Sequence, residues 1–456
     1  MRNIVLWGAV VVILLSGCTA QKRVTQPNLN TPNEFGMGME QDSLSIADMS
    51  WMELLGDPIL NDLIEQTLQH NKDILIASAR ITEFERKHRI TRSGQFPTVG
   101  VEGYIDHETT TTTDGSTKIE DELSLTANLS WELDLFGRLR WANRGALYDY
   151  LQTEEARRAL EMTLIAEVAT SYFELLALDT ELSIVENTLS TRRENVGKAK
   201  LRFEGGLTSE IPYQQAQVEL ARTASLLPDL QLKIRIKENE IAYLAGRYPS
   251  SVERAKRDPE AISEDMLKLG LPSELIARRP DIREAELAYK SASAKVGVEW
   301  ANRFPRFTFG LEGGFEFTQF DGFFTAPWSY AVANMTTPLF SFGRRKAQYE
   351  AAIAACEAKC YAYEKRVLVA FHEVSNAVEA YRAAMENTRL MEHLKNSSRK
   401  YVDLALVQYL NGQINYIDVL DAQRSYFNAE IDHSDAIRDQ YLALINLYKA
   451  LGGGWN

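Results

Sequence analysis

The sequence predicts a mainly α-helical protein with a membrane β-barrel portion, built from a duplicated repeat of long antiparallel helices and a β-hairpin. Long stretches that are almost free of Gly and Pro favour long helices. Two runs of strict apolar and polar alternation favour long strands. Short motifs that recur about 206 positions apart indicate the duplication.

The composition is that of a folded chain with a large core. Of 456 residues, 45% are hydrophobic and 25% are charged, which excludes a disordered chain, a collagen-like fibre, a disulfide scaffold and a polytopic helical membrane protein. The net charge is −13, and no Lys/Arg-rich block stands out that could bind phosphates. We therefore expect no nucleic acid partner.

The N-terminus has the form of an export signal. A short basic start precedes 12 apolar residues, 4–15, which are too few to span a bilayer as a permanent helix. Residues 15–18, Leu-Ser-Gly-Cys, resemble a bacterial lipobox, which implies removal of 1–17 and attachment of lipid to the sulfur and amino group of Cys18. The alternative is an ordinary signal peptide in which Cys18 is incidental.

Two segments predict long strands. Apolar and polar side chains alternate strictly from Glu122 to Leu135 and again from Arg306 to Thr318. Each segment exceeds the average globular strand and matches the roughly 10 residues that cross an outer membrane at a tilt. Each also has a possible hairpin partner across turn residues. The predicted strands are about 98–111, 121–135, 306–320 and 327–338.

Four strands are too few to close a barrel, which needs about eight. Unpaired strand edges are not tolerated in lipid, so the sequence predicts an oligomer that pools its strands. The alternative is that the four strands form the edge of a soluble β-sandwich or two ordinary hairpins.

Two long helical stretches account for much of the remaining chain. Residues 344–411 contain neither Gly nor Pro over 68 positions, and only two glycines interrupt 139–204. At 1.5 Å per residue, the longer stretch permits a helix of roughly 100 Å. Apolar residues recur at helical spacing along the other stretch. Such length suits helices packed side by side in a tube or coiled coil.

The two halves of the chain are copies of each other. The tripeptide Phe-Gly-Arg occurs at 136–138 and again at 342–344, and the turn at 205–207 matches the turn at 411–413 with the same offset. Each copy is therefore predicted to contain, in order, a helix, a strand hairpin, a long helix, a tight glycine turn and a long return helix.

On these features the chain resembles the TolC-like outer membrane factor family, in the lipid-anchored branch that serves multidrug export. The motifs are Trp51–Leu60, the Leu-Pro to Arg-Pro-Asp-Ile-Arg segment at 271–283, and Tyr409–Gln423. The resemblance covers nearly all of 50–453. It implies a homotrimer in which three copies of four strands and four helices form a 12-stranded β-barrel continuous with a 12-helix α-barrel.

The repeat and the resemblance together predict the domain organisation. Residues 1–17 are the signal peptide, 18–56 a lipid-anchored N-terminal tether, 57–246 the first outer membrane efflux repeat, 247–270 a linker, and 271–453 the second repeat.

The resemblance implies that the protein lets molecules pass through it and does not catalyse a reaction. The expected role is the exit duct of a tripartite pump, lying in the outer membrane with its helical tube in the periplasm and passively conducting drugs or other small molecules. The expected partners are a periplasmic adaptor (membrane fusion protein), an inner-membrane resistance-nodulation-division transporter and outer-membrane lipid. Two alternatives are the same duct for protein secretion or metal-ion efflux, and a lipid-anchored coiled-coil scaffold without a pore.

A separate search for catalytic motifs leads to the same expectation of no enzyme, no cofactor and no metal. None of the six His residues has metalloprotease spacing, and no phosphate loop, dinucleotide fingerprint or nucleophile elbow occurs. Cys356 and Cys360 lie four apart on one helical face and could form half a metal site. Without a His or a further Cys nearby, we expect them to be buried packing residues.

The predicted helix tips carry the candidate functional residues. By itself, the three-residue spacing of Asp418, Asp421 and Arg424 indicates a solvated helix face. The resemblance implies a periplasmic gate instead, in which these acids and a hydrophobic neighbour narrow the entrance. In a trimer each acid would form a ring of three, and the converging carboxylates need a cation, a proton or Arg424 nearby to stay close. The predicted gate residues are Ile417, Asp418, Asp421 and Arg424. The predicted adaptor-contacting tips are Gly205, Gly206, Leu207, Asn411, Gly412 and Gln413.

One position departs from the family pattern. Some relatives have an acidic residue aligned with Pro212 that latches the residue at the position of Tyr409. The side chain of Pro212 cannot accept such a hydrogen bond, and Gln214 or Glu210 are candidate substitutes.

Overall fold

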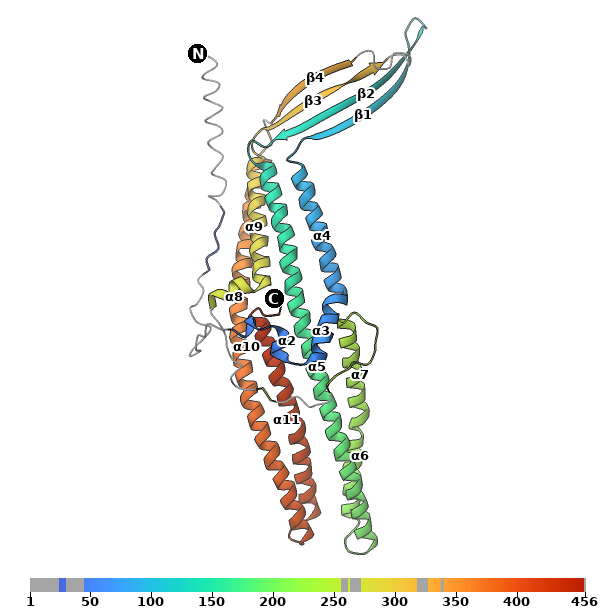
Figure 1. Ribbon diagram of the computed structural model, residues 1–456, viewed down its shortest axis with the longest axis vertical. Coiled ribbons are helices and arrows are strands. Elements are labelled where there is room, and N and C mark those ends of the chain that lie inside the picture. The colour runs from blue at the N-terminus through green and yellow to red at the C-terminus, as the bar shows by residue number, and fades with distance from the viewer. Residues whose placement is uncertain are drawn as a thin grey trace. The chain divides into compact units, whose positions relative to one another are not determined.

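The computed structural model of the chain describes residues 24–29, 45–255, 261–262, 272–317, 327–337 and 340–454 (Figure 1). The signal peptide and Cys18 lie outside these residues. The chain divides into two compact units. The strand unit comprises Met1–Leu29, Ala79–Glu154 and Glu284–Lys365, and the tip unit comprises Asn30–Ser78, Glu155–Arg283 and Arg366–Asn456.

The strand unit contains one antiparallel sheet with the order β1-β2-β3-β4, so the predicted hairpin partners are confirmed (Figure 1). The second strand begins earlier than expected because the first hairpin turn is tight: Gly115 has a φ of 84°, and Thr112 N donates to Ser116 O at 2.8 Å. The strands are β1 (Thr98–Thr111), β2 (Thr117–Leu133), β3 (Arg306–Phe317) and β4 (Pro327–Thr336). The predicted ends at 320 and 338 fall outside the described residues.

The register of the sheet gives it two chemically different faces. Leu129 pairs with Leu311 and Trp131 with Phe309, so the alternating apolar residues of neighbouring strands lie on one face. The other face carries acidic residues such as Glu102. The alternation read from the sequence is therefore a property of the whole sheet.

The helices repeat as the duplication predicts. The helices that precede the two hairpins, α4 and α9, have 22 residues each, and those that follow, α5 and α10, have 67 each. Among the described residues, none of these helices combines the length and apolar character needed to cross a bilayer. The helices are α2 (Trp51–Leu55), α3 (Pro58–His70), α4 (Lys72–Ser93), α5 (Arg138–Glu204), α6 (Ile211–Ala224), α7 (Leu226–Leu244), α8 (Pro272–Arg278), α9 (Pro280–Ala301), α10 (Arg344–Leu410) and α11 (Tyr416–Ala450), with a 3-10 helix η3 at Ile46–Asp48.

The expectation of one long return helix in each copy is wrong for the first copy. The return segment there is divided at Ser225 into α6 and α7, whereas α11 is continuous over 35 residues. Pro228 explains the division, because it has no N–H to donate to the carbonyl of Ala224 four residues earlier.

The core of the tip unit joins α5 to the start of the first repeat and to α11. Tyr172 is fully buried, and its hydroxyl donates to Asp57 Oδ2 at 2.7 Å. The other oxygen of Asp57 caps α3 by accepting from Ile59 N at 2.8 Å. Phe173 stacks on Tyr441 of α11 with ring centroids 4.0 Å apart. Asp57 and Pro58, which belong to the motif Trp51–Leu60, thus form a helix start that is tied to the core.

Candidate functional site

Both long helices end in the same glycine-dependent turn. At the end of α5, Gly206 has a φ of 70° and Leu207 N donates to Arg202 O at 2.9 Å. At the end of α10, Gly412 has a φ of 74° and Gln413 N donates to Gln408 O at 2.9 Å. These are Schellman turns, in which glycine takes a left-handed conformation that is costly for other residues. The two predicted tips therefore have equivalent local structures.

The predicted gate residues lie in the first turns of α11. Asp418 accepts from Asn415 N at 2.9 Å, so this carboxylate caps the helix that carries it. Asp421 is exposed, and Ile417 is 54% exposed. Their side chains are therefore at the surface of the single chain, where a ring could form only with other copies.

Within the single chain, Arg424 bonds to a residue outside the predicted gate. Its Nη2 donates to Glu219 Oε1 at 2.5 Å, and the other oxygen of Glu219 accepts from Arg192 Nη1 at 2.5 Å. Asp421 acts on Arg424 only as a neighbouring charge, which raises the pKa of Arg424 less than Glu219 does. Glu219 on α6 thus bridges α5 and α11, and the sequence analysis missed it.

Glu219 is a buried carboxylate that stays ionised. Its side chain is 3% exposed, and burial alone would raise its pKa. The hydrogen bonds from Arg424 and Arg192, with the charges of both guanidinium groups, outweigh burial and lower the pKa of Glu219 to about 2. A buried charge paired on both sides is strongly sensitive to loss of a partner. We call Arg192, Glu219 and Arg424 the charge bridge.

A groove lies beside the charge bridge, between α6 and α11. Its volume is about 520 Å³. Ile211 and Val218 of α6 and Ile417 of α11 give it an apolar lining, and Glu219 and Arg424 form part of its wall. The charge bridge therefore sits where the two return helices face one another.

Tyr409 contacts a cation and a ring rather than the proposed substitutes for the latch. The guanidinium of Arg202 lies 5.3 Å from its ring centroid, and the ring of Tyr416 lies 5.5 Å away. Gln214 and Glu210 instead bond to each other at 2.9 Å. The contact between the tip of α5 and Tyr409 is thus a cation–π contact.

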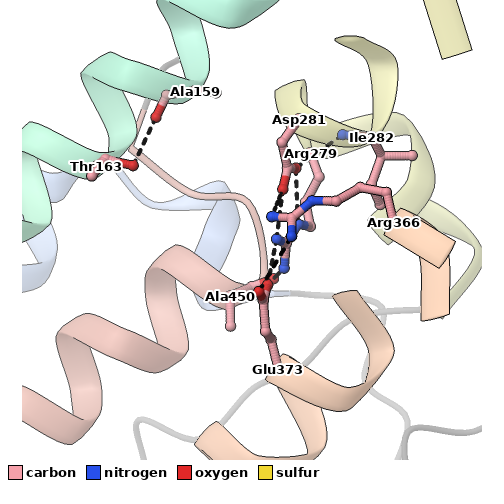
Figure 2. Close-up of polar contacts among 8 residues, drawn as sticks. All are labelled: Ala159, Thr163, Arg279, Asp281, Ile282, Arg366, Glu373 and Ala450. Atoms are coloured by element: carbon pink, nitrogen blue, oxygen red, sulfur yellow. Dashed lines mark hydrogen bonds and ion pairs between the residues drawn. The ribbon is translucent and has the colours of Figure 1, made fainter. Parts of the chain in front are cut away.

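A second charged cluster explains the Arg-Pro-Asp-Ile-Arg motif (Figure 2). Arg279 is 3% exposed and donates to Asp281, to Glu373 Oε2 at 2.5 Å and to the carbonyl of Ala450 at 2.9 Å. Arg366 pairs with Asp281 from α10. Burial would raise the pKa of Asp281, but the two arginines outweigh it and lower this pKa. The motif therefore fastens the start of α9 to α10 and to the end of α11.

The cysteine pair is buried, as expected. Cys356 is 1% and Cys360 0% exposed, in an apolar cluster with Tyr289, Val296 and Tyr349. Burial raises the pKa of Cys356 to about 11, with a further contribution from Cys360. Within the described residues no group of three or more His, Cys, Asp or Glu is arranged to hold a metal ion.

Comparison with known proteins places these features in a family. The model of the outer membrane efflux protein family matches residues 63–247 and 271–453. The solvent efflux pump outer membrane protein SrpC of Pseudomonas putida is 30% identical over 98% of this chain and 97% of its own length. The cation efflux system protein CusC of Escherichia coli is 27% identical over 98% and 97%.

A solved structure agrees with the sequence matches. The open state of the MtrE outer membrane channel of Neisseria gonorrhoeae matches with a TM-score of 0.80 and 26% identity, over 95% of this chain and 97% of that one. Together with the paired long helices and the four-stranded sheet, these matches show that the chain belongs to the outer membrane efflux protein family.

Proposed function

We propose that this outer membrane efflux protein is the passive exit duct of a tripartite pump and conducts drugs or other small organic molecules without catalysis. It works as a homotrimer, and the observation that carries the trimer is the sheet. In its described part β1 and β4 have a neighbour on one side only, and such edges need partners in lipid. Three copies pair β1 of one with β4 of the next and close a 12-stranded barrel.

Exposed apolar residues on the helices of the tip unit support the trimer. Leu390, Leu394 and Tyr401 of α10 are 50%, 42% and 45% exposed and lie four and seven residues apart, the spacing of a coiled-coil seam. Leu232 and Ile236 of α7 are 58% and 55% exposed. We infer that these two stripes face each other between neighbouring copies, because exposed apolar stripes of this length mark protein interfaces.

The remaining partners follow from the proposed role. A periplasmic adaptor engages the turns at 205–207 and 411–413, and a resistance-nodulation-division transporter in the inner membrane delivers the cargo. Lipid on Cys18 anchors the mature chain to the outer membrane, and the helical tube lies in the periplasm.

The charge bridge gives the proposed gate a physical mechanism. Ile417, Asp418 and Asp421 are carried by α11, and the bond from Arg424 to Glu219 holds α11 against α6. Opening by the adaptor must separate these helices and take one partner from Glu219, whose side chain is 3% exposed while that of Arg424 is 45% exposed. Loss of a partner from a buried carboxylate is costly unless it is rehydrated. The bridge therefore keeps the entrance narrow at rest.

Planar-bilayer conductance of the purified protein tests the duct and the gate together. We expect discrete channels, and a several-fold larger conductance in Glu219→Gln and in Arg424→Ala. Arg424→Ala removes the link between α6 and α11, and Glu219→Gln replaces its ion pair by at most a weaker, neutral acceptor. The matched control is Arg222→Ala: Arg222 also contacts Glu219, at 3.4 Å, but from the same helix and with 67% of its side chain exposed. Its removal breaks no link between helices.

The outcomes separate duct from gate. Absence of channels from folded wild-type protein would contradict the duct and favour the pore-free scaffold. If wild-type protein forms channels and all three variants have the wild-type conductance, the duct is supported and the gate is contradicted.

A cation cargo is the second candidate, because CusC is a cation efflux protein and matches almost the whole chain. Export of an organic dye and of Zn²⁺ by cells that carry the protein as the sole outer-membrane duct distinguishes the two. We expect dye export, in keeping with the higher identity to the solvent pump protein SrpC. Export of Zn²⁺ alone would reverse the assignment.

A further inference from the structure

A short N-terminal segment is held on the strand unit by three separate interactions. The hydroxyl of Tyr289 on α9 donates to the carbonyl oxygen of Thr25 at 2.9 Å. Asn28 N donates to Glu364 Oε1 on α10 at 2.7 Å. Val24 packs against the apolar cluster that contains Tyr289. We call Val24–Asn28 the clamp segment.

The clamp segment lies over the buried thiols. The apolar cluster beneath Val24 contains Cys356 and Cys360. The Glu364 oxygen that accepts from Asn28 N also lies 4.0 Å from Cys360 Sγ. One carboxylate oxygen therefore contacts both the clamp segment and the second thiol.

The pattern of burial along the clamp segment shows that one of its sides contacts the protein. Val24, Thr25 and Pro27 are half-buried, whereas Gln26 and Asn28 are exposed. Two backbone groups of the segment are satisfied by side chains of two different helices, and a hydrogen bond to a charged acceptor is among the stronger ones in proteins. The clamp segment is thus bound by a donor on α9 and an acceptor on α10 that match its backbone groups.

We propose that the clamp segment fastens the N-terminal part of the chain to α9 and α10 and shields Cys356 and Cys360 from solvent and thiol reagents. This goes beyond the duct function and does not depend on it. The thiolate is the reactive form of cysteine, so the raised pKa of both thiols slows their reactions while they are covered. Release of the clamp segment rehydrates the thiols and makes them reactive.

The alkylation rate of the two thiols by N-ethylmaleimide tests the proposal, with full-length protein in detergent. Trypsin separates the thiols into peptides Ala347–Lys359 and Cys360–Lys365, which mass spectrometry quantifies independently. Asn28→Pro removes the donor N–H, whereas the matched Asn28→Ala keeps it. We expect alkylation of Cys360 to be about tenfold faster in the Pro variant, the factor for loss of one hydrogen bond to a charged group, and unchanged in the Ala variant.

A second pair of variants tests the apolar contact. Val24→Asp places a charge against the cluster, and Gln26→Asp places the same charge at an exposed position of the segment. Faster alkylation in the first variant alone supports the clamp. Rates within twofold of wild type in all four variants would overturn it, as would equal acceleration by Asn28→Pro and Asn28→Ala. Helical circular dichroism of each variant confirms that it is folded.

Discussion

Glu219 connects the packing of three helices to the proposed gate. Its two oxygens each accept from a different arginine, Arg192 on α5 and Arg424 on α11. Such an arrangement gains little stability over an apolar one but is costly to break one partner at a time. That property suits the proposed gate, in which the contact holds until the adaptor separates the helices.

The lowered pKa of Glu219 predicts the pH range in which the charge bridge acts. The folded pKa, about 2, lies below the ordinary value of 4.5. The bridge therefore stabilises the fold fully above about pH 4.5, and this stabilisation, about 3 kcal/mol at most, is lost as the pH falls from 4.5 towards 2. We expect the stability difference between wild type and Glu219→Gln to shrink across this range in denaturant titrations. A difference that is constant with pH would contradict the bridge.

Arg279 is the residue of the Arg-Pro-Asp-Ile-Arg motif with the largest expected effect on stability. Arg279→Met removes the buried guanidinium that donates to Asp281, Glu373 and the carbonyl of Ala450, which we expect to cost about 3–5 kcal/mol in unfolding followed by circular dichroism. Asp281 keeps its contacts with Arg366 and Ile282 N. The control is Lys233→Met, which removes an exposed pair within α7 and should cost less than about 1 kcal/mol. Equal effects would mean that the cluster is not structural.

Arg424 and the two tip turns could be predicted from the sequence as functional positions, whereas Glu219 was not predicted. Residues that stand at equal distances on either side of a tight turn face each other in a helical hairpin. Arg192 and Glu219 stand 14 and 13 residues from Gly206, so their opposite charges were a usable signal. The burial of Glu219 and its bond to α11 depend on how a third helix packs against this hairpin. The spacing of residues along one hairpin gives no information about that packing.

At the scale of elements, the absence of Gly and Pro predicted the long helices and the alternation predicted the strands. The confirmed α10 ends at Leu410, one residue before the predicted limit at Asn411. The break at Ser225 was not predicted. Its cause, Pro228, is the third residue of α7, and a proline in the first turn of a helix is tolerated, so the proline by itself does not show where one helix ends and the next begins.

Two glycines in the helical hairpins should respond to Ala in opposite directions. Gly412 has a left-handed conformation, so Gly412→Ala should destabilise the protein by about 1 kcal/mol. Gly197 lies inside α5 with open space around its Cβ position, so Gly197→Ala should stabilise by up to about 1 kcal/mol. Thermal unfolding of both variants checks this prediction. An increase of the unfolding temperature in both variants would contradict the turn geometry at Gly412.

At the scale of the whole molecule, the exposed stripes predict which positions hold the trimer together. Leu394→Glu places a charge in the seam on α10 and should convert trimers to monomers in native mass spectrometry, because a buried unpaired charge is costly. Asn396→Glu, two residues away on the opposite helix face and exposed, should leave the trimer intact. Trimers that persist in both variants would place the interface elsewhere.

The break at Ser225 makes the two return segments mechanically unequal. In α6 and α7 the hydrogen bond from position 228 to Ala224 cannot form, whereas α11 is uninterrupted from Tyr416 to Ala450. In the proposed trimer, three divided return segments and three continuous ones would line the tube. Ile417 and Asp421 of the proposed gate belong to the continuous helix α11, so we expect a force applied to them to act along all of α11. We expect the divided segments to bend at Ser225 and allow the charge bridge to separate.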